Sequence, residues 1–250
     1  MNCITKNIPN SVTCLNLLCG ITAIIFASTP FDYTDALPHW QWSMIFIALA
    51  SVADFADGFL ARLLGAYSDL GKQLDSLSDN VSFGVAPSLL LFFILKAYPG
   101  YPDWAPWVAL TIPVCGVLRL AKFNIDSRQS VDFIGMPIPA NAIFWIGYCA
   151  MIAPSIEIMA TGTPGVTLSP WSDALSNPFI IVPVIVVEAL MMISPLRMFS
   201  LKFKSYGLKE NALRYILLVS TLALLIIFGL PGLTVTIILY VLLSLCYRKA

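Results

Sequence analysis

Charge is scarce in this chain, and the scarcity defines its class. Only 11% of the 250 residues are charged, and 14 lysines and arginines balance 14 aspartates and glutamates, so the formal net charge is zero. Hydrophobic residues make up 58% of the sequence, and the mean hydropathy is +0.84. This composition excludes an ordinary soluble domain and predicts a polytopic membrane protein, which we expect to be a single domain over residues 1–250.

Histidine and paired cysteines are also lacking. The one histidine, His39, lies between apolar runs, which excludes histidine-based triads and histidine-rich metal sites. The six cysteines are scattered in or beside apolar stretches without a C-x-x-C pair. We therefore expect them to pack as small apolar residues and not to form disulfides or bind zinc. We expect no nucleic-acid partner.

Long apolar runs are what the chain has in place of charge. A run of about 17 to 25 residues is long enough to cross a bilayer as a helix. The sequence predicts an all-α membrane bundle of about eight such helices, near residues 12–29, 41–63, 73–97, 104–122, 138–156, 177–195, 213–229 and 232–247.

The basic residues orient this bundle. With eight spans, every one of the 14 lysines and arginines except Lys96 falls on the same side. Because cytoplasmic loops carry an excess of lysine and arginine, both termini are predicted to be cytosolic. The chain is therefore expected in the cytoplasmic (inner) membrane.

Two of the predicted spans are interrupted by acidic residues. The stretch from residue 54 to 79 reads D-x-x-D-G-x-x-A-R, then eight residues, then G-x-x-x-D-x-x-x-D. On helices, Asp54 and Asp57 share one face at i and i+3, and Asp75 and Asp79 share another at i and i+4. An aspartate at membrane depth costs about 2.5 to 3.5 kcal/mol, so intramembrane acids are normally partnered and functional. Solvated loop charges are the alternative interpretation.

Four facing carboxylates would repel one another unless cations were bound between them. Oxygen-only ligands suit Mg²⁺ or Mn²⁺, and we expect two such ions. Small residues on the same faces, Gly58, Ala61 and Gly71, leave room for a flat or phosphate-bearing ligand to approach the backbone. The predicted topology places this site near the cytosolic ends of the second and third spans.

The acidic stretch resembles the complete signature of the CDP-alcohol phosphatidyltransferase family. Eight positions at fixed spacing carry the resemblance: Asp54, Asp57, Gly58, Ala61, Arg62, Gly71, Asp75 and Asp79. It implies a six-helix family core plus two further helices, a homodimer, and transfer of a phosphatidyl group from CDP-diacylglycerol to an alcohol with release of CMP.

The resemblance also implies a role for each position. Asp54, Asp57 and Asp75 would bind metal, and Asp79 would be the catalytic base and a shared metal ligand. Two divalent ions would neutralise the pyrophosphate, and the base would accept the proton of the acceptor hydroxyl. The remaining contacts to the CDP-lipid are assigned to five signature positions: Asp57, Gly58, Ala61, Arg62 and Gly71.

Segments outside the signature indicate the acceptor alcohol. RLAKFN at 119–124 and DFIGMPIPANA at 132–142 resemble the phosphatidylserine synthase branch of the family, and SPLRMFSLKFK at 194–204 does so more loosely. The branch implies L-serine, whose carboxylate needs a cation such as Arg119 or Lys122. Lys122 stands where the branch often has arginine, which loses bidentate geometry. Anchoring of the fourth span on the cytosolic side is the alternative role for both residues.

Two polar residues within predicted spans lie outside these motifs. For Asn16, a hydrogen bond between helices is favoured over a place in the site. Glu188 must be partnered inside the sixth span, by a group that the sequence does not identify.

Other functions remain open at this point. The same chemistry could use glycerol 3-phosphate or an inositol phosphate, although a phosphorylated acceptor calls for more basic residues. Membrane prenyltransferases also use aspartate-rich helices with Mg²⁺, normally as two separated motifs. A divalent-cation transporter is the non-enzymatic alternative, but its acids are expected near the midplane on broken, repeated helices.

Overall fold

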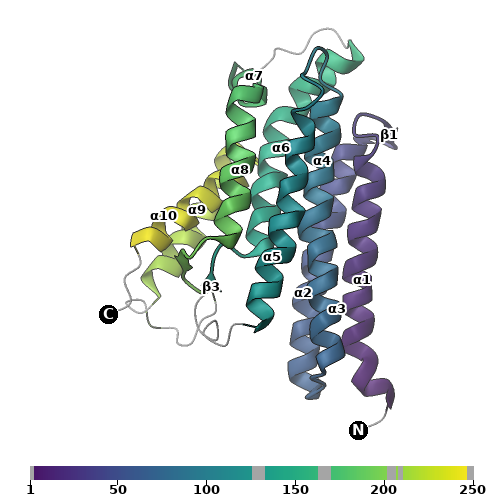
Figure 1. Cartoon of the computed structure of the whole chain (residues 1–250), viewed down its shortest axis with the longest axis vertical. Helices are drawn as coiled ribbons and strands as arrows, with labels where there is room; N and C mark the ends of the chain where they lie inside the picture. Colours follow the sequence, from purple (N-terminus) through teal and green to yellow (C-terminus); the bar gives the residue numbers. More distant parts are fainter. Residues whose placement is uncertain (1–2, 126–132, 163–169, 202–206, 208–210, 247–250) are drawn as a thin grey trace.

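Helices dominate the computed structural model, which describes residues 3–125, 133–162, 170–201, 207 and 211–246. Most of them run along the long axis of the bundle, whereas α9 and α10 are inclined to the rest (Figure 1). The helices are α1 (Cys3–Ala27), α2 (His39–Leu64), α3 (Asp69–Asp79), α4 (Ala86–Lys96), α5 (Thr111–Ile125), α6 (Ile138–Thr161), α7 (Pro170–Ser176), α8 (Pro178–Ile193), α9 (Ala212–Phe228) and α10 (Gly232–Cys246), with a π-helical turn at Asn80–Val85 and a 3-10 turn at Pro106–Leu110.

The strands are minimal. β1 (Tyr33–Thr34) pairs with β2 (Leu37–Pro38), and β3 (Phe133–Ile134) pairs with β4 (Arg197–Met198), each in an antiparallel ladder. The described part of the chain is therefore mostly helical, as the sequence predicts.

Each of the eight predicted apolar runs contains a helix. Among the described residues, five helical segments are long and apolar enough to cross a membrane: Asn7–Ala27, His39–Leu64, Asp69–Lys96, Pro106–Ile125 and Ile138–Thr161. Three shorter apolar helices follow, Pro178–Ile193, Ala212–Phe228 and Gly232–Cys246. The number of eight spans and the cytosolic termini therefore stay predictions.

The turn between α2 and α3 is set by local sequence signals. Gly65 ends α2 in the left-handed region, at φ 58°. Ser68 then caps α3 by accepting a hydrogen bond from the Gly71 backbone N–H at 3.0 Å. This cap starts the helix at Asp69, earlier than the apolar run that begins near residue 73, because a polar first turn is stabilised by its cap and not by burial. The turn brings the two acidic segments onto adjacent helices.

A π-helical turn joins α3 to α4 directly after Asp79. Ser82 in this turn donates a hydrogen bond to the backbone oxygen of Asn16 in α1 at 3.0 Å. A Cβ on Gly20 would lie only 2.4 Å from Ser82 Oγ, so α1 approaches the turn closely because residue 20 has no side chain. Such π turns are often found at functional sites.

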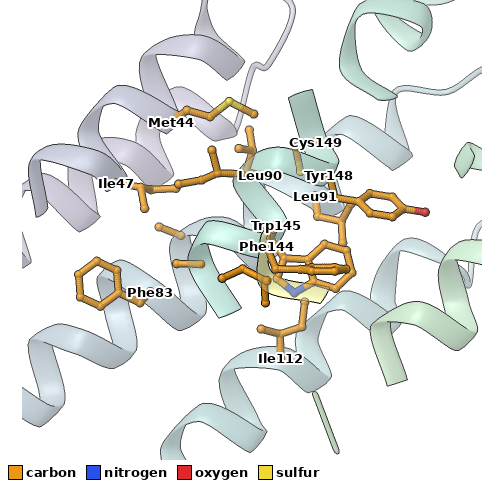
Figure 2. Close-up of a cluster of buried hydrophobic side chains, with 14 of the residues drawn as sticks. Met44, Ile47, Phe83, Leu90, Leu91, Ile112, Phe144, Trp145, Tyr148 and Cys149 are labelled. Carbon is orange, nitrogen blue, oxygen red and sulfur yellow. The ribbon is translucent and has the colours of Figure 1, made fainter. Parts of the chain in front are cut away.

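The core lies between α4, α6 and their neighbours. In the most apolar stretches of Asp69–Lys96 and Ile138–Thr161, 61% and 67% of residues are buried, against 28% in each of the other three candidate spans. Figure 2 shows part of this core, in which aliphatic side chains meet an aromatic group: Met44, Ile47, Phe83, Leu90, Leu91, Ile112, Phe144, Trp145, Tyr148 and Cys149.

The outer faces are apolar, as expected for helices that contact lipid. Phe55 in α2 is 71% exposed and Ile226 in α9 is 76% exposed. Large exposed apolar surfaces are unusual on soluble proteins. The cysteines with described side chains are free: Cys14, Cys19, Cys115, Cys149 and Cys246.

The strand pair β3–β4 joins two segments that are far apart in the sequence. Ile134 lies opposite Arg197, and the Gly135 backbone N–H donates to the Leu196 oxygen at 2.7 Å. A Cβ on Gly135 would lie 2.1 Å from the Met192 oxygen. The described residues of the two segments that resemble the phosphatidylserine synthase branch are therefore held side by side.

Candidate active site

A cavity of about 460 Å³ lies between α1, α2, α3 and α5 and reaches the start of α6. All eight signature positions line it: Asp54, Asp57, Gly58, Ala61, Arg62, Gly71, Asp75 and Asp79. Helical spacing puts the signature residues of α2 on one face of that helix and those of α3 on one face of the other. The turn that begins at Gly65 brings the two faces together.

Three of the four aspartates form the centre of this cavity. Carboxylate oxygens of Asp54, Asp57 and Asp75 lie within 4.8 Å of one another. With an effective dielectric constant of about 20, each pair of unit charges at that distance would repel by about 3 kcal/mol. A set of carboxylate oxygens this close fits a hard divalent cation such as Mg²⁺ or Mn²⁺, which would replace repulsion by attraction. The residues present therefore fit the expected metal.

The fourth aspartate, Asp79, stands beside this group. It shares a side-chain hydrogen bond with Asp54 and interacts electrostatically with Asp54 and Asp75, although it is not a member of the three-carboxylate group. The predicted cluster of four therefore comes together as three carboxylates and one neighbour. Asp79 therefore adjoins the group through Asp54.

Helix α1 supplies hydrogen-bond donors to two of the aspartates. Thr13 Oγ1 donates to Asp57 Oδ2 at 2.6 Å, and Asn16 Nδ2 donates to Asp79 Oδ1 at 3.3 Å. The predicted helix-to-helix hydrogen bond of Asn16 is confirmed, and its acceptor is a residue of the site. Sequence reasoning missed Thr13, although the i, i+3 spacing of two polar residues in an apolar run is a usable signal.

The two glycines of the signature differ in their surroundings. A Cβ added to Gly58 would meet only Arg62 Nη1, at 3.7 Å, among the described residues. A Cβ added to Gly71 would lie 2.9 Å from Asn10 Oδ1 and 3.0 Å from Ser68 Oγ. Gly58 therefore leaves space open to the cavity, whereas Gly71 also permits the close approach of α1 to α3.

The two candidate acceptor-binding cations are placed differently. Arg119 is 6% exposed and lines the cavity, with its guanidinium carbon 5.1 Å from the centre of the Phe123 ring. It interacts electrostatically with Asp79. Lys122 is exposed, and its Nζ donates to the Ile193 backbone oxygen at 3.5 Å. Of the two, Arg119 lines the cavity and Lys122 does not.

Hydrogen bonds across one side of the cavity connect α3 to the end of α5. Lys72 Nζ donates to the Asn124 backbone oxygen at 3.1 Å, and Asn124 Nδ2 donates to Ser76 Oγ at 2.9 Å. All three residues line the cavity. The sequence patterns do not single out Ser76, and they include Lys72 only among the basic residues.

Glu188 stays without an identified partner. It is 6% exposed in α8, and no hydrogen bond reaches its Oε1 within the described residues. Glu188 does not line the acidic cavity.

An apolar helix bundle with an acidic cavity suited to divalent cations defines a membrane protein with a candidate metal site. The family model for CDP-alcohol phosphatidyltransferase matches residues 6–178, which is more than half of the chain. The chain therefore belongs to the CDP-alcohol phosphatidyltransferase family, and it is an integral membrane enzyme. The family predicted from the signature is confirmed.

Three similar proteins carry the same name. The chain is 37% identical to the CDP-diacylglycerol–serine O-phosphatidyltransferase of Bacillus subtilis over 163 residues, covering 64% of the chain and 84% of that protein. It is 38% identical to the protein of that name from Methanocaldococcus jannaschii over 145 residues, covering 58% and 61%. The match to the Helicobacter pylori protein of that name is 30% identical over 236 residues, covering 93% and 86%.

Proposed function

We propose that this protein transfers a phosphatidyl group from CDP-diacylglycerol to the hydroxyl of L-serine, giving phosphatidylserine and CMP. One observation supports the proposal most directly. The carboxylates of Asp54, Asp57 and Asp75 converge to within 4.8 Å in a cavity that Asp79 and Arg119 also line. The names of the relatives supply the choice of serine.

The metal would be held by Asp54, Asp57 and Asp75, with Asp79 at the edge of the group. We propose two ions, Mg²⁺ or Mn²⁺. When bound, they would neutralise the pyrophosphate of the CDP-lipid and stabilise the departing phosphate of CMP.

The nucleotide end of the CDP-lipid would occupy the wall formed by the small signature residues. Gly58 and Ala61 lie on the cavity face of α2, and the space above Gly58 is open. A flat base or ribose can approach a backbone that carries no side chain. Arg62 at the same wall can pair with phosphate oxygens. The cavity volume of about 460 Å³ lies in the range of small-molecule sites.

Asp79 would act as the base toward the acceptor. The serine hydroxyl gives its proton to the Asp79 carboxylate, the serine oxygen bonds to the phosphatidyl phosphorus, and the bond from that phosphorus to the CMP oxygen breaks. Asp79 lines the same cavity beside the three carboxylates that would hold the metal. Asp79 is therefore the residue that we assign to this step.

Arg119 would hold the acceptor. It is a buried cation on the cavity wall, and its electrostatic interaction with Asp79 places it near the proposed base. A guanidinium can bind a carboxylate through two parallel hydrogen bonds. Lys122, exposed and outside the cavity lining, is not part of this proposal.

We further propose that the site opens to the cytosol. Three basic residues, Arg62, Lys72 and Arg119, line the acidic cavity, whereas Lys96 ends α4, far along the same span. By the positive-inside rule, this distribution supports a cavity at the cytosolic face of the cytoplasmic membrane. A homodimer is proposed on the family resemblance alone.

The test is CMP release by the purified protein in detergent with CDP-diacylglycerol and Mn²⁺ or Mg²⁺. Four reactions are compared: L-serine, glycerol 3-phosphate, inositol phosphate and no acceptor. Release stimulated only by serine would support the proposal. Stimulation by a phosphorylated alcohol would keep the chemistry and replace the acceptor, and an absence of release with every acceptor and metal would refute both.

A further inference from the structure

The geometry points to Asn16 as a positioning residue that orients the Asp79 carboxylate toward the acceptor. The inference rests on the proposed function, because it assumes that Asp79 receives the acceptor proton. It concerns a residue of α1, outside the acidic signature.

The two hydrogen-bond donors of α1 contact different aspartates. Thr13 donates to Asp57, which belongs to the three-carboxylate group, at 2.6 Å. Asn16, one turn further along the same face, donates to Asp79, which does not belong to it, at 3.3 Å. One face of α1 therefore orients a metal-site carboxylate through a hydroxyl and the proposed base through an amide.

Asn16 is itself fixed in place. Its side chain is fully buried, and its backbone oxygen accepts a hydrogen bond from Ser82 at 3.0 Å. Ser82 belongs to the π turn that begins directly after Asp79. The close approach at Gly20 holds α1 against the same turn. The π turn therefore contacts the backbone of Asn16 through Ser82 and directly follows Asp79, the residue that the Asn16 amide contacts.

The hydrogen bonding of Asn16 differs from that of a buried structural asparagine in the same bundle. Asn141 uses both ends of its amide, since Nδ2 donates to the Phe83 oxygen at 3.1 Å and Oδ1 accepts from Trp145 Nε1 at 3.0 Å. At Asn16, Nδ2 reaches Asp79, and Oδ1 has no hydrogen-bond partner within the described residues. Within the described residues, the hydrogen bond to Asp79 is therefore the interaction that the Asn16 side chain makes.

An amide is suited to this task. A cation at the same place would pair with the Asp79 carboxylate and weaken it as a base. A neutral N–H donor fixes the direction of the carboxylate while leaving its second oxygen free to accept a proton. We expect loss of the amide to slow turnover without weakening binding of the CDP-lipid.

The test compares Asn16→Leu, which removes the donor at similar volume, with wild-type enzyme. Turnover with serine should fall about 10- to 100-fold, as is typical when an orienting partner is lost. The KM for CDP-diacylglycerol, the Mn²⁺ concentration for half-maximal activity, and the affinity for CDP-diacylglycerol measured by calorimetry should each change less than about threefold. Asn141→Leu is the matched control: it should lower the unfolding temperature and leave turnover per folded molecule unchanged.

Either of two results would overturn the inference: wild-type turnover in Asn16→Leu, or an equal loss of turnover and of CDP-lipid and Mn²⁺ binding. If the leucine variant does not fold, Asn16→Ala carries the test, because it removes the donor without adding a group that can bind a proton; wild-type turnover there would also overturn the inference. Failure of the proposed function is separate, since wild-type enzyme would then show no serine-stimulated CMP release.

Discussion

Two of the carboxylate sites in this bundle have different partners. Near the end of α6, Glu157 accepts hydrogen bonds from the Trp40 indole at 3.0 Å and from the Tyr33 hydroxyl. Trp40 is in the first turn of α2, whereas Asp54 lies 14 residues further along that helix, or about 21 Å away at 1.5 Å per residue. At that other end, three aspartate side chains crowd within 4.8 Å.

The two sites show how a carboxylate can be accommodated in an apolar bundle. Glu157 is a single charge with two neutral donors, and these bonds tie the β1 segment and α2 to α6. In the aspartate group, a side-chain hydroxyl reaches Asp57, yet three carboxyl groups remain within 4.8 Å of one another. The first arrangement is complete without an ion and holds the fold together; the second calls for cations and can therefore do chemistry.

The strongest test of this comparison removes one carboxylate of the acidic group. We expect Asp75→Ala to lower serine-dependent CMP release by about 1,000-fold or more, because a ligand of the charge-stabilising metal is lost. Mn²⁺ titrations of activity and of CDP-lipid binding measure the effect. Asp69→Ala is the control, since Asp69 is an exposed acid on the same helix. Unaltered Mn²⁺ dependence in Asp75→Ala would contradict the metal assignment.

Next in size is the change that removes the base but keeps its shape. Asp79→Asn should lower turnover by about 100- to 10,000-fold, the usual contribution of a general base. Binding of CDP-diacylglycerol with Mn²⁺ should persist, because the three-carboxylate group is intact. Turnover and calorimetric binding are compared in one preparation, and near-normal turnover would remove Asp79 from the mechanism.

A smaller effect is expected from the cation that faces the acceptor. Arg119→Gln should raise the KM for serine about 10- to 100-fold, since a charge-assisted bidentate contact is lost. The KM for CDP-diacylglycerol should stay within about threefold. Lys122→Gln provides the comparison, and its exposed position predicts less than a twofold change. The reverse order of effects would assign acceptor binding to Lys122.

At the other carboxylate site, loss of charge should cost stability and not activity. Glu157→Gln keeps the shape but weakens the hydrogen bonds from Trp40 and Tyr33. We expect the free energy of unfolding to fall by about 1 kcal/mol with turnover unchanged. Thermal unfolding in detergent measures the change in stability, and a serine-dependent CMP-release assay measures turnover. A loss of turnover matching that of Asp75→Ala would abolish the distinction between the two sites.

The smallest expected effect is a change in pH dependence. The hydrogen bond to Glu157 raises the pKa of the Tyr33 hydroxyl above its ordinary value near 10. Because the folded-state pKa is the higher one, this contribution to stability is complete below pH 10 and is lost as the pH rises through the folded-state pKa. Tyr33→Phe should therefore have a flatter stability profile above pH 10. Identical profiles for the two proteins would show that the bond has no effect on stability.

The positions of the helices were largely predictable, because long apolar runs have few alternatives in a membrane. The features that could not be predicted depend on local capping or on tertiary packing. The start of α3 depends on the Ser68 cap, and the π turn after Asp79 depends on how α1 packs against it at Gly20. The pairing of β3 with β4 joins residues more than 60 positions apart, which no local pattern reports.

The acidic site was predictable to a similar extent. Helical spacing and a turn suffice to bring the eight signature positions to one cavity. The sequence could not tell which face of α1 would dock there, so it missed Thr13 and left the acceptor of Asn16 unnamed. It also could not separate Arg119 from Lys122, because burial on one helix depends on its neighbours. The catalytic and metal-binding roles themselves stay predictions.

Because of the π turn at Asn80–Val85, the direction in which Asp75 and Asp79 point depends on the number of residues in that turn. Each residue of an α-helix advances the chain by about 100° around its axis, and a π turn contains about one residue more than an α turn. Deleting one residue there would rotate Asp75 and Asp79 by about 100° relative to α4. Every side chain of the site would still be present, but the carboxylates would face away from α1 and α2. The percentage of identical residues would hardly change after such a deletion, although the site would be lost.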